Sequence, residues 1–379
     1  MISTSNSSPS LGKVPSMFTS NDAPGDAAAE QANMQTIIEA RIAPDETTDD
    51  STSDIGSDTA SNSSVSSSVY EFRVEHGRKY QKYREGKYHY PIDERESERL
   101  DLQHWLCLGS FRNKLGLAPP NDEGSSVKRV LDLGTGTGLW AIEFGDEHPA
   151  AESRQVIGVD IVPPQVEFVP PNVFFEIDDI DETWTYSQPF DYIHSRMMTS
   201  SISNWKDYIQ KCFDHLEPNG YLELQEADLF PQSDDGTLKP DAAIVRSCQN
   251  VQKACTIFGR PFASIPDLAT VMTEVGFKDV VLTKNKWPMN SWPKDPHYKT
   301  LGTWSLENYL QGIEGWTMAA FTKGLGWTKE QVQVFLIDVR NEMKDRTIHA
   351  YWPVYSIYGR KPAPTPEAAE KQGSESQNP

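Results

Sequence analysis

Val130-Leu131-Asp132-Leu133-Gly134-Thr135-Gly136-Thr137-Gly138 is the stretch that decides the fold. Its apolar start predicts a strand over 129–133, and a helical pattern follows the glycines over 139–148. Glycine lets the backbone turn tightly and approach a ligand, and a helix start offers unpaired N–H groups. The GxGxG spacing is tighter than a dinucleotide loop, which leaves room for a pyrophosphate. With a carboxylate two residues before the first glycine, the loop suits a ligand that carries a positive amino group.

Outward from this loop, short apolar runs alternate with helical stretches. Strands are expected over 129–133, 155–160, 173–177, 190–195, 220–226, 276–283 and 354–358, and helices over 139–148, 208–215 and 265–275. This alternation predicts βαβ units and an α/β fold with a mostly parallel, seven-stranded sheet. Two helical insertions interrupt the pattern, at about 241–258 and 298–345, with the clearest helical pieces of the second over 305–313 and 328–344.

The flanks of this pattern differ in composition. Residues 1–69 hold ten acidic and two basic residues, and nine of the nineteen residues from Ser51 to Val69 are serine, which predicts a disordered acidic tail. We expect residues 70–120 to form an N-terminal helical cap, with one or two helices over 95–117. A cofactor-binding domain then spans 121–362, and residues 363–379 form a second disordered tail.

The bulk properties exclude some classes of function. The formal net charge of −20 gains nothing from contact with phosphates, so nucleic acid is not expected as a direct partner. The four cysteines form no CxxC pair and no zinc-spaced cluster, so we expect reduced thiols and no metal. No run approaches the ~20 apolar residues of a membrane span, and the first 25 residues lack the apolar core of a secretory signal. A cytoplasmic location is expected.

Acidic residues recur where the next strands end. Asp160 closes the second expected strand, Asp178-Asp179-Ile180 follows the third, and the fourth ends in His194-Ser195-Arg196. Ligands of open α/β sheets sit at the carboxyl ends of strands, where an acid commonly accepts hydrogen bonds from ribose hydroxyls. Asp160 is placed for that role, and Asp179 for an adenine amino group. Singly, each has a plainer alternative, because a glycine turn is often only a turn, Asp160 could cap a helix and Asp179 could face solvent.

Taken together, these segments resemble the motif series of class I S-adenosylmethionine methyltransferases. A closer resemblance, over about 70–362, is to the LaeA-like methyltransferases of filamentous fungi. It rests on Tyr80–Tyr88 (YQKYREGKY), Asp101–His104 (DLQH), Asp191–Arg196 (DYIHSR), His215–Glu226 (HLEPNGYLELQE) and Tyr358–Pro362 (YGRKP). The resemblance implies a Rossmann-like class I methyltransferase fold and S-adenosyl-L-methionine as cofactor. The expected cofactor-binding residues are Tyr80, Tyr83, Asp132, Gly134, Thr135, Gly136, Gly138, Trp140, Asp160, Ile161, Asp178, Asp179, Ile180, His194 and Ser195.

Methyl transfer from a sulfonium is an in-line displacement, so the protein mainly positions and desolvates its reactants. A general base helps only when the acceptor holds a proton at neutral pH. The candidates are His194, His104 and Glu226, with histidine preferred because its pKa lies near working pH. If a base acts, we expect His194 and His104 to face the transferred methyl, although a satisfied structural side chain is the plainer reading of each of the three residues.

Six of the ten tryptophans follow residue 280, and two of them, Trp304 and Trp316, fall in the second insertion. They could line an aromatic acceptor pocket or simply pack a cap onto the sheet. Either way, the insertions and the N-terminal helices are expected to choose the acceptor.

Three functions remain open at this point. The first is methylation of a small molecule, which the resemblance links to fungal secondary metabolism. The second is a nuclear regulator that acts through velvet-type partner proteins, against which the absence of a basic import cluster in residues 1–69 argues. The third is cofactor binding without turnover.

Overall fold

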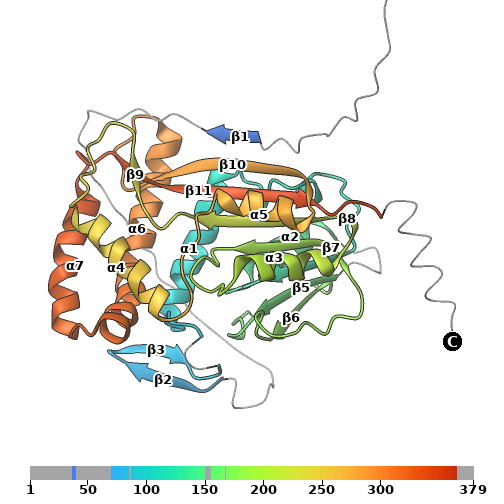
Figure 1. The fold of residues 1–379 in the computed structure, drawn as a ribbon, viewed down its shortest axis with the longest axis horizontal. Helices are drawn as coiled ribbons and strands as arrows, with labels where there is room; N and C mark the ends of the chain where they lie inside the picture. Colours follow the sequence, from blue (N-terminus) through green and yellow to red (C-terminus); the bar gives the residue numbers. More distant parts are fainter. Residues whose placement is uncertain (1–35, 40–69, 85–86, 150–154, 167, 365–379) are drawn as a thin grey trace, which may run out of the picture. The chain divides into compact units, whose positions relative to one another are not determined.

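The computed structural model describes residues 36–39, 70–84, 87–149, 155–166 and 168–364. The chain divides into two compact units, Met1–Ala32 and Asn33–Pro379, and every described residue belongs to the second. Figure 1 shows this second unit as a central sheet with helices packed on it. Most of the two tails predicted over 1–69 and 363–379 lies outside the described residues.

The central sheet contains the alternation expected from the sequence. Five parallel strands run in the order β6-β5-β4-β7-β8, and β11 continues the sheet antiparallel to both β8 and β10. Their bounds are β4 Arg129–Leu133, β5 Gln155–Asp160, β6 Val173–Ile177, β7 Phe190–Arg196, β8 Leu216–Ala227, β10 Lys278–Pro288 and β11 Ala350–Arg360. The order reverses direction between β4 and β7, and a ligand crevice is expected outside the carboxyl ends of the strands at such a switch point.

Two strands are additional to the seven that were expected. The short β9 (Gln232–Ser233) pairs with β11, and β1 (Thr36–Glu39) pairs in parallel with the edge of β10. The described part of the main sheet therefore has nine strands. For residues 36–39, the prediction of a disordered tail is wrong. They read Thr-Ile-Ile-Glu, a short stretch rich in β-branched residues within a polar segment.

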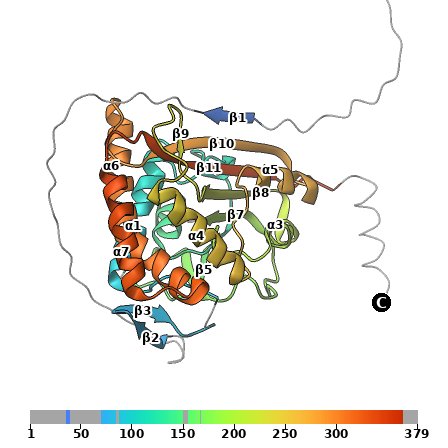
Figure 2. The ribbon, with the colours of Figure 1, turned by 60° about the vertical axis from the view of Figure 1, so that its left-hand side comes forward.

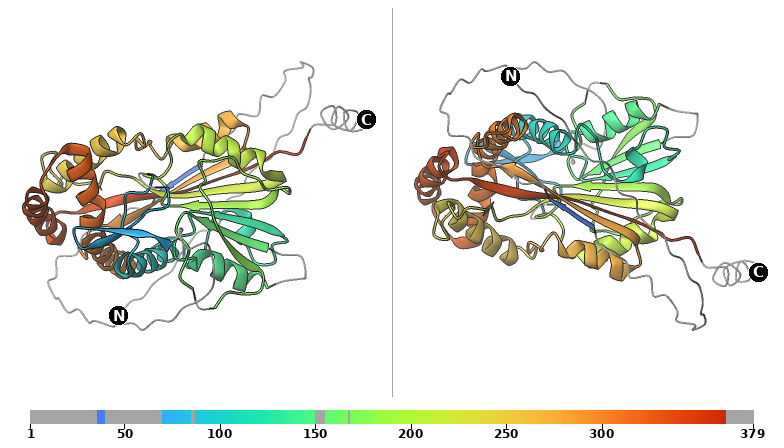
Figure 3. Two further views of the ribbon diagram at one scale, coloured as in Figure 1. Left: turned by 90° about the horizontal axis from the view of Figure 1, so that it is seen from below. Right: turned by 90° about the horizontal axis from the view of Figure 1, so that it is seen from above.

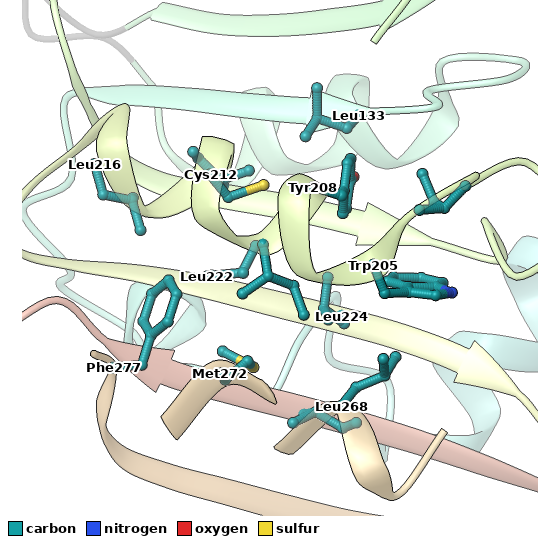
Figure 4. Close-up of a cluster of buried hydrophobic side chains, with 14 of the residues drawn as sticks. Leu133, Trp205, Tyr208, Cys212, Leu216, Leu222, Leu224, Leu268, Met272 and Phe277 are labelled. Atoms are coloured by element: carbon teal, nitrogen blue, oxygen red, sulfur yellow. The ribbon is translucent and has the colours of Figure 1, made fainter. Parts of the chain in front are cut away.

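Helices cover both faces of the sheet (Figure 3). Helices α3 (Trp205–Asp214) and α5 (Asp267–Val275) lie on one face, and α1 (Glu94–Ser110) and α2 (Leu139–Glu147) lie on the other. The face under α3 and α5 holds the largest cluster of buried apolar side chains. Figure 4 shows Leu222 and Leu224 of β8 between Tyr208 and Cys212 of α3 and Met272 of α5. Burial on both faces makes the central strands continuous apolar runs, so they are readable in the sequence.

A second apolar cluster joins four helices beside the carboxyl ends of the parallel strands. It brings together α1, α4 (Ala243–Ile257), α6 (Pro296–Ala319), which continues into the π-helical turn η3 (Ala320–Gly324), and α7 (Lys329–Lys344). Figures 1 and 2 show these helices gathered at one side of the sheet. The two predicted insertions are thus helical, and they pack with the N-terminal helix α1.

The N-terminal segment is only partly helical. Residues 70–93 contain a two-stranded hairpin, β2 (Phe72–Glu75) and β3 (Arg78–Gln81), and the single helix α1 follows, with the short η2 (Pro119–Asn121) after it. The helix starts there because the side chain of Asp93 accepts a hydrogen bond from the N–H of Glu96. Among the described residues, no helix has the length and apolar character needed to cross a membrane.

Candidate functional site

A cavity opens at the carboxyl ends of β4 to β8, between the sheet and helices α1, α4 and α6. Of the residues expected to bind the cofactor, eight line it: Gly134, Thr135, Gly136, Asp160, Ile161, Asp178, Asp179 and Ile180. The remaining expected residues, Tyr80, Tyr83, Asp132, Gly138, Trp140, His194 and Ser195, do not line it, nor do His104 and Glu226. The cavity thus lies at the edge of the sheet where the cofactor was expected, and about half of the residues predicted for the site do not line it.

The glycine loop forms one wall, and all three of its glycines have left-handed backbone angles. Their φ values are +71°, +59° and +84° for Gly134, Gly136 and Gly138. A Cβ on Gly134 would overlap the sulfur of Met198, and one on Gly138 would lie 2.7 Å from the ring of Phe175. At Gly136 the space is open, with Leu100 the nearest atom at 3.6 Å. The backbone angles therefore favour glycine at all three positions, and close neighbours add to this requirement at Gly134 and Gly138.

Asp132 was expected to bind the amino group of a ligand, but both of its carboxylate oxygens have hydrogen-bond partners within the protein. One carboxylate oxygen accepts from the hydroxyl of Thr135 at 2.6 Å, and the other pairs with Nδ1 of His194 at 2.7 Å. The side chain is 3% exposed. Asp132 thus braces the loop from beneath.

His194 and Ser195 also lie inside the sheet layers. The ring of His194 stacks on Trp140 of α2, with centroids 3.8 Å apart, and it is fully buried. The hydroxyl of Ser195 on the opposite face accepts from Tyr208 at 2.9 Å. The expectation that His194 faces the transferred methyl does not hold in this geometry, because β7 continues to Arg196. His194 is therefore two residues short of the strand end.

Arg196 occupies the place that was expected for His194. It lies two residues further along β7, on the same face, and it lines the cavity. One of its nitrogens, Nη2, lies 3.0 Å from Nδ1 of His104, and Nε2 of His104 lies 2.9 Å from the carboxylate of Glu143. His104 itself is 1% exposed and stands behind Arg196. It contacts the arginine and does not reach the cavity.

Asp160 combines the properties expected of a ligand-binding acid. Its oxygens accept from the backbone N–H of Gly136 at 2.9 Å and of Val162 at 3.0 Å, which ties the second strand end to the glycine loop. Burial raises the pKa of this carboxyl above its usual value, although the backbone hydrogen bonds act in the opposite direction. Each carboxylate oxygen has a second lone pair, so hydroxyl donors from a ligand can still be accepted.

Asp179 lines the cavity and is already paired. Its carboxylate meets the ammonium of Lys87 at 2.5 Å and accepts from the N–H of Asp181 at 3.0 Å. Burial acts to raise its pKa, but the hydrogen bond and charge of Lys87 outweigh burial and lower it. Lys87 belongs to the segment Tyr80–Tyr88, so this segment does reach the cavity, though not through Tyr80 and Tyr83, which were expected to bind the cofactor.

Those two tyrosines lie outside the cavity wall. Tyr80 is 1% exposed and packs in β3, and Tyr83 stacks beside the guanidinium of Arg84 at 5.6 Å. Further along the same segment, Tyr88 and Tyr90 line the cavity instead. The spacing of the aromatic residues in the sequence does not distinguish Tyr80 and Tyr83 from Tyr88 and Tyr90.

Glu226 supports the loop that follows β7. Its oxygens accept from the N–H of Met198 at 2.9 Å and from the N–H and hydroxyl of Thr199 at 3.1 and 2.5 Å. It is fully buried, and burial raises its pKa to about 7. Met198 and Thr199 line the cavity, whereas Glu226 does not. Its position is structural in this geometry.

The side of the cavity facing α4 and α6 is largely aromatic and apolar. Tyr309 and Trp316 of α6 line it, and Tyr309 stacks on Trp352 with centroids 3.6 Å apart. Asp228, just past the end of β8, places a half-buried carboxyl there whose pKa is raised by burial. Trp304, the other tryptophan considered for this wall, is 37% exposed and does not line the cavity.

Three cations of the cavity wall have acidic partners. Lys87 pairs with Asp179, Arg260 with Asp181 at 2.8 Å, and Arg99 with Glu96 at 2.9 Å. Within the described ranges, no group of histidine, cysteine, aspartate and glutamate side chains is arranged to hold a metal ion.

The chain is similar to known methyltransferases. A model of the methyltransferase domain matches residues 103–282. Methyltransferase pytC of Aspergillus terreus is 40% identical over 294 residues, which cover 78% of this chain and 89% of the relative. The secondary metabolism regulator LAE1 of Cochliobolus heterostrophus is 36% identical over 293 residues, covering 76% of this chain and 94% of the relative.

Among solved structures, the phosphoethanolamine N-methyltransferase 2 of Haemonchus contortus in complex with S-adenosyl-L-methionine matches with a TM-score of 0.38 and 16% identity. The match covers 62% of this chain and 49% of that chain.

Proposed function

The chain belongs to the LaeA-like family of class I S-adenosylmethionine-dependent methyltransferases, and from this we propose that it methylates a small-molecule acceptor of fungal secondary metabolism in the cavity beside α4 and α6. The proposal rests on the cavity wall formed by Gly134–Thr137 and Asp160. A hydrogen bond from the backbone N–H of Gly136 to the carboxylate of Asp160 joins the two parts of this wall. This wall is complementary to an adenosyl group, and the aromatic side faces it across the same cavity.

The residues of the cavity fit the cofactor part by part. The left-handed glycine loop brings backbone N–H groups and the open side of Gly136 to the ligand. Asp160 accepts hydrogen bonds from the ribose hydroxyls, and Asp178–Ile180 border the adenine. Arg196 is the cavity cation that faces the carboxylate of the methionine end.

When bound, the cofactor supplies a methyl group on a positively charged sulfur, which is already activated for transfer. The protein's contribution is therefore to hold the acceptor in line and to exclude water. Tyr309, Trp316 and Tyr90 provide an apolar enclosure for a flat acceptor. Asp228 lies on this side and would accept the hydrogen of an acceptor hydroxyl or amine. Its raised pKa suits it to hold that proton once the methyl is transferred.

Calorimetry with S-adenosylmethionine and its demethylated product S-adenosylhomocysteine tests the binding half of this proposal. Wild type is expected to bind both at about micromolar strength. Gly136→Val is expected to abolish binding, because a β-branched residue at φ +59° is strained and its side chain would enter the cavity. Gly326→Val is the matched control, since Gly326 has φ +73° with no neighbour around an added Cβ. If Gly136→Val folds and binds as wild type does, the cofactor site lies elsewhere.

A second candidate function is regulation through velvet-type partner proteins, in the nucleus as well as the cytoplasm. The similarity to the secondary metabolism regulator LAE1 is the observation that favours it. Pull-down of velvet proteins by the full chain tests this candidate, with the Gly136→Val variant separating partner binding from cofactor binding.

A further inference from the structure

Arg196 differs from the other cations of the cavity in what holds it. Lys87, Arg99 and Arg260 each have a carboxylate partner. Behind Arg196 the structure places a nitrogen of His104, 3.0 Å from Nη2, and the thiol of Cys107, neither of which is an acid. A cation lining a cavity without an acidic partner among the described residues is suited to an anionic part of a ligand.

The hydrogen-bond chain fixes the state of His104. A guanidinium cannot give up its protons, so Arg196 donates and Nδ1 of His104 accepts. The hydrogen of the neutral ring is then on Nε2, where Glu143 of α2 accepts it at 2.9 Å. Glu143 is 29% exposed at its side chain, and His104 is 1% exposed. These hydrogen bonds therefore connect the partly solvated carboxylate of Glu143, through the buried neutral ring of His104, to Arg196.

The surroundings of His104 support the neutral form. Burial lowers its pKa and the charge of Arg196 acts in the same direction, while Glu143 and Asp101 act against them. The ring of His104 also lies nearly perpendicular to the ring of Trp105, with centroids 5.5 Å apart. A protonated ring would carry a hydrogen on Nδ1 as well, so that the N–H donors of His104 and Arg196 would face each other.

We infer that His104, held by Glu143, is a positioning residue that aims the guanidinium of Arg196 at the carboxylate of the cofactor's methionine end. The inference rests on the proposed function. It assigns His104 to a role other than the general base expected from the sequence. The acceptor would be methylated without a proton passing through His104.

Two ligands isolate this contact. S-adenosylhomocysteine carries the amino acid end, and 5′-deoxy-5′-methylthioadenosine keeps the adenine, ribose and thioether but lacks that end. The dissociation constant of 5′-deoxy-5′-methylthioadenosine divided by that of S-adenosylhomocysteine reports on recognition of the amino acid end alone. Both are measured by calorimetry, with thermal unfolding run beside it to show that each variant is folded.

His104→Phe removes both hydrogen bonds while keeping an aromatic ring. It is expected to weaken S-adenosylhomocysteine by about tenfold and to leave 5′-deoxy-5′-methylthioadenosine unchanged. Arg196→Met is expected to lower the same ratio, and His104→Phe added to it should lower it no further. His148→Phe is the matched control, because His148 is also buried and hydrogen-bonded, to the carbonyl of Phe144 at 2.9 Å, and does not line the cavity.

His104→Asn and pH provide an independent readout. An asparagine oxygen at the position of Nδ1 can still accept from Arg196 and does not titrate. The wild-type preference for S-adenosylhomocysteine should fall as pH drops below the lowered pKa of His104, and His104→Asn should keep the preference without that fall. A structural role alone would not produce this difference.

The outcomes separate the two proposals. A wild type that binds neither ligand overturns the proposed function. A wild type that prefers S-adenosylhomocysteine, with a ratio untouched by His104→Phe and by pH, leaves the proposed function standing and overturns the role of His104. Equal weakening of both ligands by His104→Phe also overturns it.

Discussion

Glu226 is a residue whose environment predicts a measurable pH effect on stability. It is buried among three hydrogen-bond donors from Met198 and Thr199, and burial raises its pKa from the ordinary value of 4.5 to about 7. Between these two values the folded chain binds a proton that the unfolded chain has lost. Stability contributed by this group is therefore complete below about pH 4.5 and is lost as pH rises through 7, by an amount on the order of 3 kcal/mol.

Urea unfolding of wild type and Glu226→Gln between pH 5 and 8 measures this effect. The wild type is expected to lose more of its unfolding free energy over that range than the variant, since glutamine does not titrate. The control is Glu274→Gln, an exposed carboxylate on α5. Parallel pH profiles for wild type and Glu226→Gln would show that the folded-state pKa of Glu226 is near its ordinary value.

At the same scale, the sequence predicted the acids and glycines of the cavity better than the histidines. Asp160 and Gly136 follow from the position of a strand end and from backbone angles, which are local properties. The role of His194 depends on whether β7 stops at Ser195 or Arg196, a difference of one residue that reverses which side chain reaches the cavity. The partners of His104 lie 39 and 92 residues away, and no local pattern indicates them.

Among the elements, α4 has an N-terminus capped from another helix. Its own N-cap residue, Ala242, provides no side-chain hydrogen bond. The carboxylate of Glu342 on α7 accepts instead from the N–H groups of Ala243 and Ile244, at 2.8 and 2.9 Å. A negative charge at this end also interacts favourably with the helix dipole.

Glu342→Ala is therefore expected to lower the free energy of unfolding by about 1–2 kcal/mol. Because α4 lines the acceptor side, the dissociation constant of S-adenosylhomocysteine should remain within about twofold of the wild-type value. Chemical unfolding and calorimetry measure the two effects. Glu274→Ala serves as the exposed control, and a Glu342→Ala variant as stable as that control would contradict the capping role.

The helices and strands differ in how well the sequence predicted them. The bounds of β4, β5 and β6 agree with the sequence prediction, because strands buried on both faces are continuous apolar runs between polar turns. The β2–β3 hairpin was missed, since Phe72-Arg73-Val74-Glu75 alternates over only four residues and Phe72 and Val74 are exposed. The helices α6 and α7 were located in the insertion, but α6 starts at Pro296, well before its clearest periodic piece.

For the whole molecule, the cavity is built from residues between Lys87 and Thr317. The one described contribution of the first 69 residues to the sheet is β1, which adds four residues to the free edge of β10. We therefore expect residues 1–69 to be dispensable for cofactor binding. Their acidic, serine-rich composition supports the same expectation.

Two truncations separate the tail from the strand. A chain starting at residue 36 keeps β1, and a chain starting at Tyr70 removes it. Both should bind S-adenosylhomocysteine as the full chain does. The shorter chain alone should melt a few degrees lower, because a four-residue edge pairing contributes about 1 kcal/mol. It should also associate more readily, since the edge of β10 is left unpaired. A shorter chain that still melts cooperatively but no longer binds would mean that the first 69 residues contribute to the cofactor site. A melting temperature lowered equally in both truncations would instead assign the stabilisation to residues 1–35 and none of it to β1.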